Sequence, residues 1–387
     1  MVFESIQAGV PDPMFELKIR ADNDKSPLKV DLGVGIYRNE SGVYQELASV
    51  KEAKHKLAAA NLGHDYEITT GNRDFLSLAS QVMFGEGNIA SENLASVQTI
   101  SGTGAVHLAF LFIARNISSL TKVYVGVPAW GNYKPALELV GLEATEYRHY
   151  DPLTRMFDHR ATLEAIEGAP AGSVFILQGC CHNPTGADPT PEQWDEIADA
   201  LEAGGHLPLF DLAYQGLGRG LDEDAYAIRL CARRGLEMLV CQSFSKNFAI
   251  YGERCGALHV ACRDGKAAEN VHDQLRCLIR WEISSSPAFG SRIVKTVLTD
   301  DGLAVEWKAE LSSMRERIQD LRLQLFHELT HVLRTPGDWS HITQENGLFS
   351  FLKLTEAQCK YLTDQHHIYL PGNGRINMSG LNSKNLA

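Results

Sequence analysis

The middle of this chain alternates short apolar runs with segments of helical periodicity. One helical pattern covers residues 105–115. Another starts at Thr190, where Pro191 and Gln193 complete a typical helix start, and Gly204 ends it. Strand–helix alternation of this kind predicts an α/β fold with a mostly parallel sheet covered by helices on both faces. The candidate strands are residues 97–100, 122–127, 173–178, 207–210 and 238–241.

A different periodic segment spans residues 303–333, with apolar side chains three or four positions apart throughout. This pattern predicts one helix of roughly 45 Å at 1.5 Å per residue. A helix this long usually runs from one domain into another. We therefore expect a large domain at residues 41–311 and a smaller domain built from residues 1–40 and 312–387.

Composition excludes several classes of protein. The net charge of −12 argues against a nucleic-acid-binding surface, because phosphate contacts need clustered Lys and Arg. No apolar run reaches the length of a membrane span, and the N-terminus has no secretory pattern. The eight cysteines lack CxxC spacing and indicate reduced thiols of a cytoplasmic protein. Since His327 and His331 lack the glutamate of an HExxH motif, we expect no metal site.

Polar or aromatic groups follow every predicted strand. In a parallel sheet, ligands bind beyond the carboxyl ends of the strands, so these groups are expected to converge. Each motif alone is also explained by a turn or a helix cap, and the convergence is the stronger signal. The motifs are SGTG (101–104), PAWGN (128–132), CHNPTG (181–186), DLAYQG (211–216) and SFSK (243–246).

Lys246 is the most informative of these residues, because it follows an apolar run that predicts a buried strand. A lysine that is partly desolvated among cationic groups loses its proton more easily and can form a Schiff base. The SGTG motif at a helix N-terminus can bind a phosphate, and Asp211 can accept from a protonated ring nitrogen. Together these groups fit one ligand, pyridoxal 5'-phosphate.

The chain resembles the aspartate aminotransferase family, class I of the fold-type-I pyridoxal-phosphate enzymes. The similarity extends over nearly the whole sequence. It implies a large domain with a mostly parallel sheet between helices, plus a smaller α/β domain. The motifs that carry it are VDLGVGIYR (30–38), Tyr66, SGTGA (101–105), PAWGN (128–132), CHNPTGADPTPEQW (181–194), DLAYQGLGRGLDEDA (211–225), SFSKNFAIYGERCGAL (243–258), Arg280 and GRINMSGL (374–381).

The resemblance also implies a role for each cofactor-binding residue. Lys246 would carry the Schiff base and then move a proton between the substrate and the cofactor. Asp211 would keep the ring nitrogen protonated, so that the ring acts as an electron sink. Tyr214 and Asn183 would hydrogen-bond the phenolate oxygen of the ring, and Trp130 would stack on its face. The phosphate would bind Ser101, Gly102, Thr103, Ser243, Ser245 and Arg254, joined by Tyr66 of a second subunit.

Substrate binding is implied in the same way. Arg375 would bind the substrate α-carboxylate, helped by the backbone at Gly35. Arg280 of the second subunit would bind the distal carboxylate of a dicarboxylic amino acid, and two arginines suit this task because they bind carboxylates in bidentate geometry. The implied protein is a homodimer with shared active sites. Its implied reaction moves the amino group between L-aspartate and 2-oxoglutarate by a ping-pong mechanism.

Three features depart from the family pattern. Ser284-Ser285-Ser286-Pro287 replaces the usual SNPP, and homologues that accept aromatic amino acids also tend to have Ser at the position of Ser285. Tyr133 and Gln178 stand where the aspartate enzymes usually have histidines behind the cofactor. We therefore expect these two residues to adjust the charge state of the cofactor ring without loss of activity. The sequence ends at Ala387, before the usual final helix of the family.

Other functions fit the sequence less well. The nearest alternative is an aromatic or broad-specificity aminotransferase of the same class, since the sequence does not rank the amino donors. A lyase or decarboxylase is disfavoured by the paired carboxylate-binding arginines. A non-catalytic scaffold would have no reason to retain Lys246 with all its supporting residues. A nicotinamide dehydrogenase is excluded because no GxGxxG motif follows an early strand.

Overall fold

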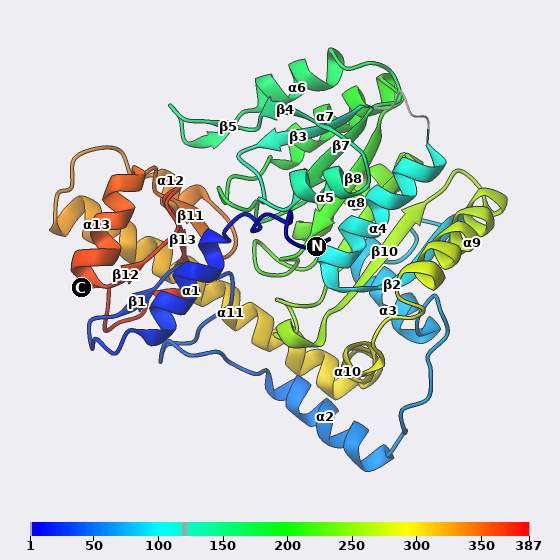
Figure 1. Cartoon of the computed structure of the whole chain (residues 1–387), viewed down its shortest axis with the longest axis horizontal. Coiled ribbons are helices and arrows are strands. Elements are labelled where there is room, and N and C mark those ends of the chain that lie inside the picture. Colours follow the sequence, from blue (N-terminus) through cyan, green and yellow to red (C-terminus); the bar gives the residue numbers. More distant parts are fainter. Residues whose placement is uncertain (1, 118–121, 387) are drawn as a thin grey trace.

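A mixed sheet forms the centre of the computed structural model, which describes residues 2–117 and 122–386; Ala387 lies outside this range. Within the described residues the sheet has seven strands in the order β2-β10-β9-β8-β7-β3-β4 (Figure 1). All neighbours pair in parallel except β10, which is antiparallel to β2 and β9. The strands are β2 (Leu94–Ile100), β3 (Val123–Val127), β4 (Ala144–Arg148), β7 (Val174–Gln178), β8 (Leu207–Leu212), β9 (Met238–Ser243) and β10 (Cys255–Ala261).

The five strands expected from the sequence are confirmed, with small changes at their ends. Strand β2 begins three residues before the predicted start at Val97, and β8 and β9 each extend two residues further. Strands β4 and β10 are additional. The α/β architecture with a mostly parallel sheet is therefore correct, and β10 adds one antiparallel strand within it.

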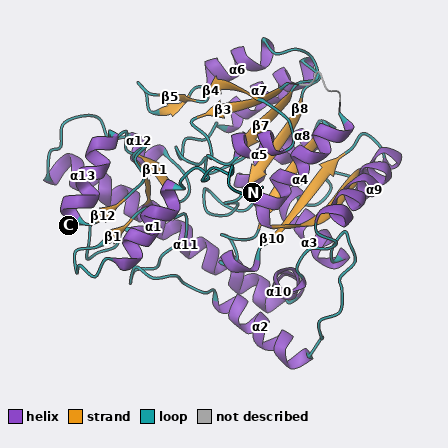
Figure 2. Ribbon diagram, in the orientation of Figure 1, coloured by secondary structure: helices purple, strands orange, loops and turns teal. Residues whose placement is uncertain are grey.

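Helices cover both faces of the sheet, and residue alternation along the strands explains why (Figure 2). In β7, Val174 and Ile176 pack in one hydrophobic cluster with helices α4, α5 and α9, while Phe175 and Leu177 pack in another with α6, α7 and α8. Successive side chains of a strand point to opposite faces, so an apolar run buries both. The helices are α4 (Ser101–Asn116), α5 (Tyr133–Leu139), α6 (His159–Glu167), α7 (Pro191–Ala203), α8 (Tyr226–Arg233) and α9 (Gly265–Glu282).

Helix α7 confirms the predicted start. The Thr190 hydroxyl accepts from the Gln193 backbone N–H at 3.3 Å, and the Gln193 side chain accepts from the Thr190 N–H at 2.9 Å. Trp194, Ile197 and Leu201 then face the sheet and are buried. The helix is thus fixed by its cap and its apolar stripe together.

The predicted long helix is also present. Helix α11 (Asp301–His327) continues into a π-helical turn, Glu328–Val332. It crosses from the sheet to a second group of elements, drawn at the left of Figure 1. There β1 pairs with β12 and β11 with β13, so that the first and last parts of the chain lie together. The division at residues 40 and 311 stays a prediction.

The remaining elements complete the molecule. Helices α2 and α10 pack against each other and against α11, and α3 packs against α8 and α10. Within the described residues, no helix is both long enough and apolar enough to cross a bilayer. These elements are α1 (Pro13–Asn23), α2 (Ala48–Ala60), α3 (Arg73–Phe84), α10 (Ala288–Thr299), α12 (His341–Gln344), α13 (Glu356–His366), β1 (Val30–Asp31), β5 (Tyr150–Asp151), β6 (Met156–Phe157), β11 (Phe349–Phe351), β12 (Ile368–Tyr369) and β13 (Arg375–Asn377).

A buried arginine joins α11 to the segment before β11. The Arg322 guanidinium donates to the backbone carbonyls of Ile342, Gly347 and Phe349 at 3.0, 2.9 and 2.6 Å. It also pairs with the buried carboxylate of Glu345 at 2.9 Å. The long helix thereby fixes the backbone that presents Phe349, which matters for the site described below.

We expect Arg322→Met to lower the free energy of unfolding by about 3–5 kcal/mol, because it leaves the buried Glu345 carboxyl and three backbone carbonyls without their hydrogen-bond donor. Lys308→Met, on an exposed position of the same helix, is the matched control and should change stability by less than about 0.5 kcal/mol. Urea unfolding monitored by fluorescence measures both variants. Equal stability of the two would show that the pair does not hold this segment.

Candidate active site

One pocket lies at the carboxyl ends of β7, β8 and β9 and at the first turn of α4, where the sequence predicts it. Eleven predicted site residues line it. Three further residues, Gln178, Ala213 and Tyr251, complete its wall. The eleven are Ser101, Gly102, Thr103, Trp130, Asn183, Asp211, Tyr214, Ser243, Ser245, Lys246 and Arg254.

The α4 end of the pocket is suited to an anion. Ser101, Gly102 and Thr103 form the first turn of this helix, whose free N–H groups and dipole favour negative charge. The Arg254 guanidinium donates to the Ser101 hydroxyl at 2.7 Å, and the Ser101 N–H donates to the Arg254 carbonyl at 2.9 Å. The hydroxyls of Ser243 and Ser245 lie on the same wall.

Gly102 permits this close assembly. A Cβ at this position would lie 2.8 Å from the Cβ of Ser243, which is closer than real side chains approach. Only a residue without a side chain lets the helix start and the end of β9 come together around the anion site.

Lys246 and Asp211 carry the opposite charges of the pocket. Both side chains touch the pocket while surrounding protein atoms enclose them. Burial lowers the pKa of the Lys246 ammonium to about 8, with the attraction of Asp211 opposing this shift and Arg254 adding to it. Burial raises the pKa of Asp211 to about 6, while Tyr133 and Lys246 work in the opposite direction. At this pKa about a tenth of Lys246 is neutral and nucleophilic at pH 7.

The loop that carries Lys246 is fixed by helix α11. The Trp307 indole N–H donates to the carbonyl of Asn247 at 2.8 Å, and its ring stacks on Phe248 with 4.6 Å between centroids. On the pocket side, the Lys246 Nζ lies 5.0 Å from the centre of the Tyr214 ring. The lysine therefore extends from a rigid loop toward Tyr214 and Asp211.

Asn183 is held by Gln178 on the neighbouring turn of chain. The Gln178 side chain accepts from the Asn183 N–H at 2.8 Å and donates to the Asn183 carbonyl at 3.0 Å. This pairing leaves the Asn183 side chain free to face the pocket, where its Oδ1 accepts from Arg375 at 3.1 Å. Gln178 is thus a supporting residue, as its predicted position behind the cofactor suggests.

Arg375 borders the pocket with unused bonding capacity. One terminal nitrogen donates to Asn183 and the other to the carbonyl of Gly33 at 2.6 Å. Its guanidinium lies over the Phe349 ring, 4.3 Å from the centroid. Its Nε is buried and has no hydrogen-bond partner among the described residues. A buried donor without a partner is costly, so the site is prepared for an acceptor such as a carboxylate.

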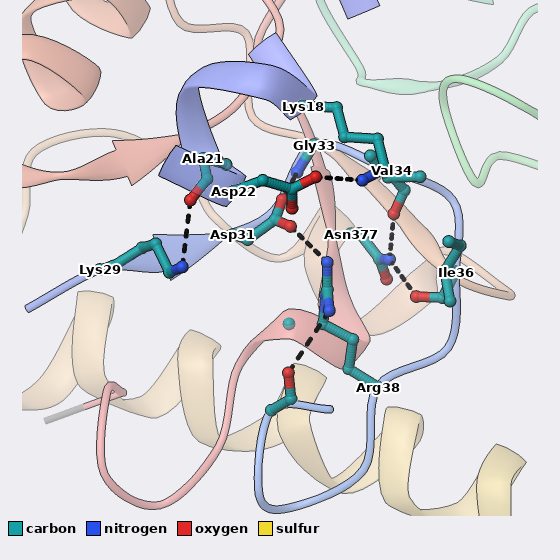
Figure 3. A network of polar contacts seen from close by, with 12 residues as sticks. Lys18, Ala21, Asp22, Lys29, Asp31, Gly33, Val34, Ile36, Arg38 and Asn377 are labelled. Carbon is teal, nitrogen blue, oxygen red and sulfur yellow. Dashed lines mark hydrogen bonds and ion pairs between the residues drawn. The ribbon is translucent and has the colours of Figure 1, made fainter. Parts of the chain in front are cut away.

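Segment 30–38 contacts Arg375 through the Gly33 carbonyl. Asn377 holds this segment in place (Figure 3). The Asn377 side-chain amide donates to the carbonyls of Val34 and Ile36 at 2.6 and 2.8 Å. Asp31 accepts from the Gly33 N–H at 3.1 Å and pairs with Arg38. These contacts fix the backbone at Gly35.

Gly35 lies directly against the pocket wall. A Cβ there would lie 2.9 Å from the Phe349 ring and 3.7 Å from the Tyr214 hydroxyl. Gly35 therefore adjoins Tyr214 and Phe349 without lining the pocket itself.

Tyr66 and Arg280 are not brought to this pocket. Tyr66 is 88% exposed, and Arg280 is exposed near the end of α9, where it donates to the Ser284 hydroxyl at 2.6 Å. Their predicted place in the active site of a second subunit stays a prediction. Tyr251 lines the pocket, although no role is predicted for it from the sequence. Its carbonyl accepts from Arg254 at 2.8 Å, and its place three residues before Arg254 is the signal that could have found it.

Cys180, Cys181 and Asp224 lie close enough together to be considered as metal ligands. The Asp224 carboxylate already accepts from the backbone N–H groups of Gly216, Gly218 and Arg219 at 2.8–2.9 Å. Contact with Cys181 and burial raise the pKa of the Cys180 thiol, and burial raises that of Cys181 to about 12. The hydrogen bonds of Asp224 thus give this carboxylate a structural role, which is to hold the backbone turn at residues 216–219.

Comparison with known proteins defines the class. Residues 27–387 match the model of the family "Aminotransferase class I and II". The aminotransferase tasG of Hapsidospora irregularis is 44% identical over 100% of this chain and 93% of its own length. The mitochondrial aspartate aminotransferase of Dictyostelium discoideum is 42% identical over 99% of this chain and 90% of its own. The chain belongs to the class I and II aminotransferase family.

A similar solved structure contains the cofactor. The aromatic-amino-acid aminotransferase of Burkholderia pseudomallei, covalently bound to pyridoxal phosphate, superposes with a TM-score of 0.96 at 34% identity and covers 100% of this chain and 97% of that one. The present protein is an aminotransferase whose cofactor is pyridoxal 5'-phosphate. Its own pocket fits this group, because an anion site, an enclosed carboxylate and a lysine of lowered pKa lie around one cavity.

We expect Gly102→Ala to weaken the binding of pyridoxal 5'-phosphate by roughly tenfold or more, since about 1.4 kcal/mol of displaced contacts corresponds to that factor. The new methyl group would push Ser243 and the helix start apart. Gly131→Ala is the control, because a Cβ there meets no atom within 4 Å. Titration of the apoprotein with the cofactor, followed by absorbance, measures both. An unchanged affinity of Gly102→Ala for the cofactor would show that the first turn of α4 is not part of the phosphate site.

Proposed function

We propose that this aminotransferase moves the amino group between L-aspartate and 2-oxoglutarate, giving oxaloacetate and L-glutamate. The observation that carries the proposal is a pair of arginines that lack a carboxylate partner among the described residues. Arg375 has an unpartnered, buried Nε beside the pocket, and Arg280 is exposed with the Ser284 hydroxyl as its hydrogen-bond partner. A dicarboxylic amino acid offers one carboxylate to each.

The proposed cofactor contacts follow from the lining of the pocket. The phosphate binds at the first turn of α4 together with Ser243, Ser245 and Arg254. Asp211 would accept from the ring nitrogen, and Trp130 would lie against the ring. Tyr214 and Asn183 would donate to the ring's phenolate oxygen. When bound, the cofactor withdraws the electrons that a substrate Cα–H bond leaves behind.

Lys246 is the proposed catalytic base. Its lowered pKa of about 8 leaves a share of neutral amine near neutral pH. The neutral amine removes the proton from the substrate Cα and returns it at the cofactor C4' atom. The Lys246 amine lies over the Tyr214 ring, 5.0 Å from its centre. Arg375 holds the α-carboxylate so that the Cα–H bond faces Lys246.

We also propose a homodimer with shared active sites, located in the cytoplasm. Tyr66 and Arg280 are exposed in one chain, and each would complete the pocket of the partner. Trp281 and Phe289, close to Arg280, are 67% and 45% exposed, and a subunit contact would cover them. The proposed domains are residues 41–311 for the cofactor, and residues 1–40 with 312–387 for the smaller unit.

An aromatic or broad-specificity aminotransferase is the second candidate. Ser285 stands next to the Ser284 hydroxyl that holds Arg280, within a serine-rich segment. The similar Burkholderia structure is named an aromatic-amino-acid aminotransferase. In this candidate Arg280 turns away from an apolar side chain. The predictions below separate the two candidates.

Replacing Lys246 by Ala is expected to leave a folded protein in which transamination of L-aspartate falls by roughly two to four orders of magnitude, the usual contribution of a positioned acid–base group. Exposed Lys308→Ala is the control. Single-turnover kinetics with the bound cofactor measure the effect. Turnover like that of the unmodified protein would end the assignment of Lys246.

Arg280→Ala is expected to lower kcat/KM for L-aspartate by about 100-fold or more, the loss typical when one member of a buried charge pair is removed. The same change should affect L-phenylalanine by less than about tenfold, because phenylalanine has no second carboxylate. Arg276→Ala, on the same helix and paired with Asp273, is the control. Equal losses for both substrates would mean that Arg280 does not read the side chain, and a strong preference for phenylalanine in the unmodified protein would favour the second candidate.

A further inference from the structure

Tyr133 lies directly behind the Asp211 carboxylate. It is the first residue of α5, and its hydroxyl donates to Asp211 Oδ2 at 2.6 Å. The ring is 2% exposed and meets Trp130 edge to face, with 5.3 Å between centroids. Among the described residues, no other side chain donates a hydrogen bond to this carboxylate.

The other groups around Asp211 do not replace this contact. Lys246 and Tyr214 face it from the pocket, and Cys241 lies opposite it on β9. Gln178 lies opposite it on β7, but its amide is used on the Asn183 backbone. Lys246 acts on Asp211 through charge at a distance, and Tyr214 and Cys241 make no hydrogen bond to it.

Enclosure by the protein and the hydrogen bond from the Tyr133 hydroxyl shift the pKa of Asp211 in opposite directions. Removal from water favours the neutral acid and raises the pKa of Asp211 to about 6, whereas the Tyr133 hydrogen bond favours the anion. The Tyr133 hydroxyl keeps its proton and remains a donor, because burial and the neighbouring Asp211 raise the pKa of this phenol well above its usual value. An O–H donor at 2.6 Å from a carboxylate is in the range of strong, charge-assisted hydrogen bonds.

We propose that Tyr133 is a positioning residue that keeps Asp211 ionised and directs its second oxygen toward the ring nitrogen of the cofactor. The inference rests on the proposed role of Asp211. Without the hydroxyl, Asp211 would take up a proton more readily, and the ring nitrogen would lose its negative partner. Tyr133 therefore acts on the cofactor through the carboxylate, without contact of its own.

The test is the pH dependence of cofactor affinity, with no amino acid present. Apoprotein is titrated with pyridoxal 5'-phosphate between pH 5 and pH 8, for the unmodified protein, Tyr133→Phe and Tyr147→Phe. Tyr147 is a buried tyrosine near the same wall without a hydrogen bond to Asp211, and it serves as the control. The cofactor phosphate also titrates in this range, equally in every variant.

Affinity should rise as Asp211 ionises, that is, with increasing pH. In Tyr133→Phe this rise should move to higher pH by about one unit, since a hydrogen bond to a charged group contributes about that much. Tyr147→Phe should follow the unmodified protein. A Tyr133→Phe profile that superposes on that of the unmodified protein overturns the proposal.

Two further variants keep the test decisive. Tyr133→His retains an N–H donor and should keep the midpoint near that of the unmodified protein; a shift as large as that of Tyr133→Phe overturns the proposal. In an Asp211→Asn background, Tyr133→Phe should change nothing further, because no carboxylate remains to be tuned. An additional shift there would mean that Tyr133 acts by packing alone. Asp211→Asn that binds cofactor like the unmodified protein would instead refute the proposed role of Asp211.

Discussion

The enclosure of two opposite charges at the ends of neighbouring strands is the constraint on which this structure depends. Lys246 and Asp211 are both largely enclosed by protein atoms, and their mutual attraction offsets only part of the cost of taking each charge out of water. The protein meets this cost with fixed groups: Tyr133 on Asp211, and Trp307 on the loop that carries Lys246. The helices around the sheet therefore do more than cover it, because α5 and α11 supply these supports.

The sequence predicts the parts of the fold that depend on local pattern. Apolar runs in β7, β8 and β9 are continuous because both faces are covered, and Thr190 with Gln193 fixes the start of α7 through neighbouring residues. The antiparallel direction of β10 could not be predicted from its local sequence pattern. A buried strand has the same apolar pattern whether it runs parallel or antiparallel, so its pairing depends on distant residues of β2 and β9.

The same distinction holds for the site. Ten of the eleven predicted residues meet in one pocket because each lies at or after the end of a parallel strand or begins a helix, and the carboxyl ends of parallel strands share one edge. The eleventh, Arg254, precedes the antiparallel β10, whose first residues pair with the last residues of β2 and β9. The roles of Asn377 and Arg322 could not be predicted, since their partners are backbone carbonyls that only the folded chain brings near. Tyr66 and Arg280 are exposed in the described chain, and their predicted place in the site of a second subunit stays a prediction.

Arg375 has a consequence for how tightly any carboxylate can be held. Two of its three guanidinium nitrogens already donate to the protein, one to Asn183 and one to Gly33, and its Nε is without a partner. An arriving carboxylate that takes both oxygens to the guanidinium must share or displace one of these bonds. Recognition at this position is then an exchange of partners, so the net affinity is smaller than the contacts in the complex would suggest. The bonds to Asn183 and Gly33 also hold the guanidinium in place beforehand, and this fixed orientation reduces the entropy lost when the substrate binds.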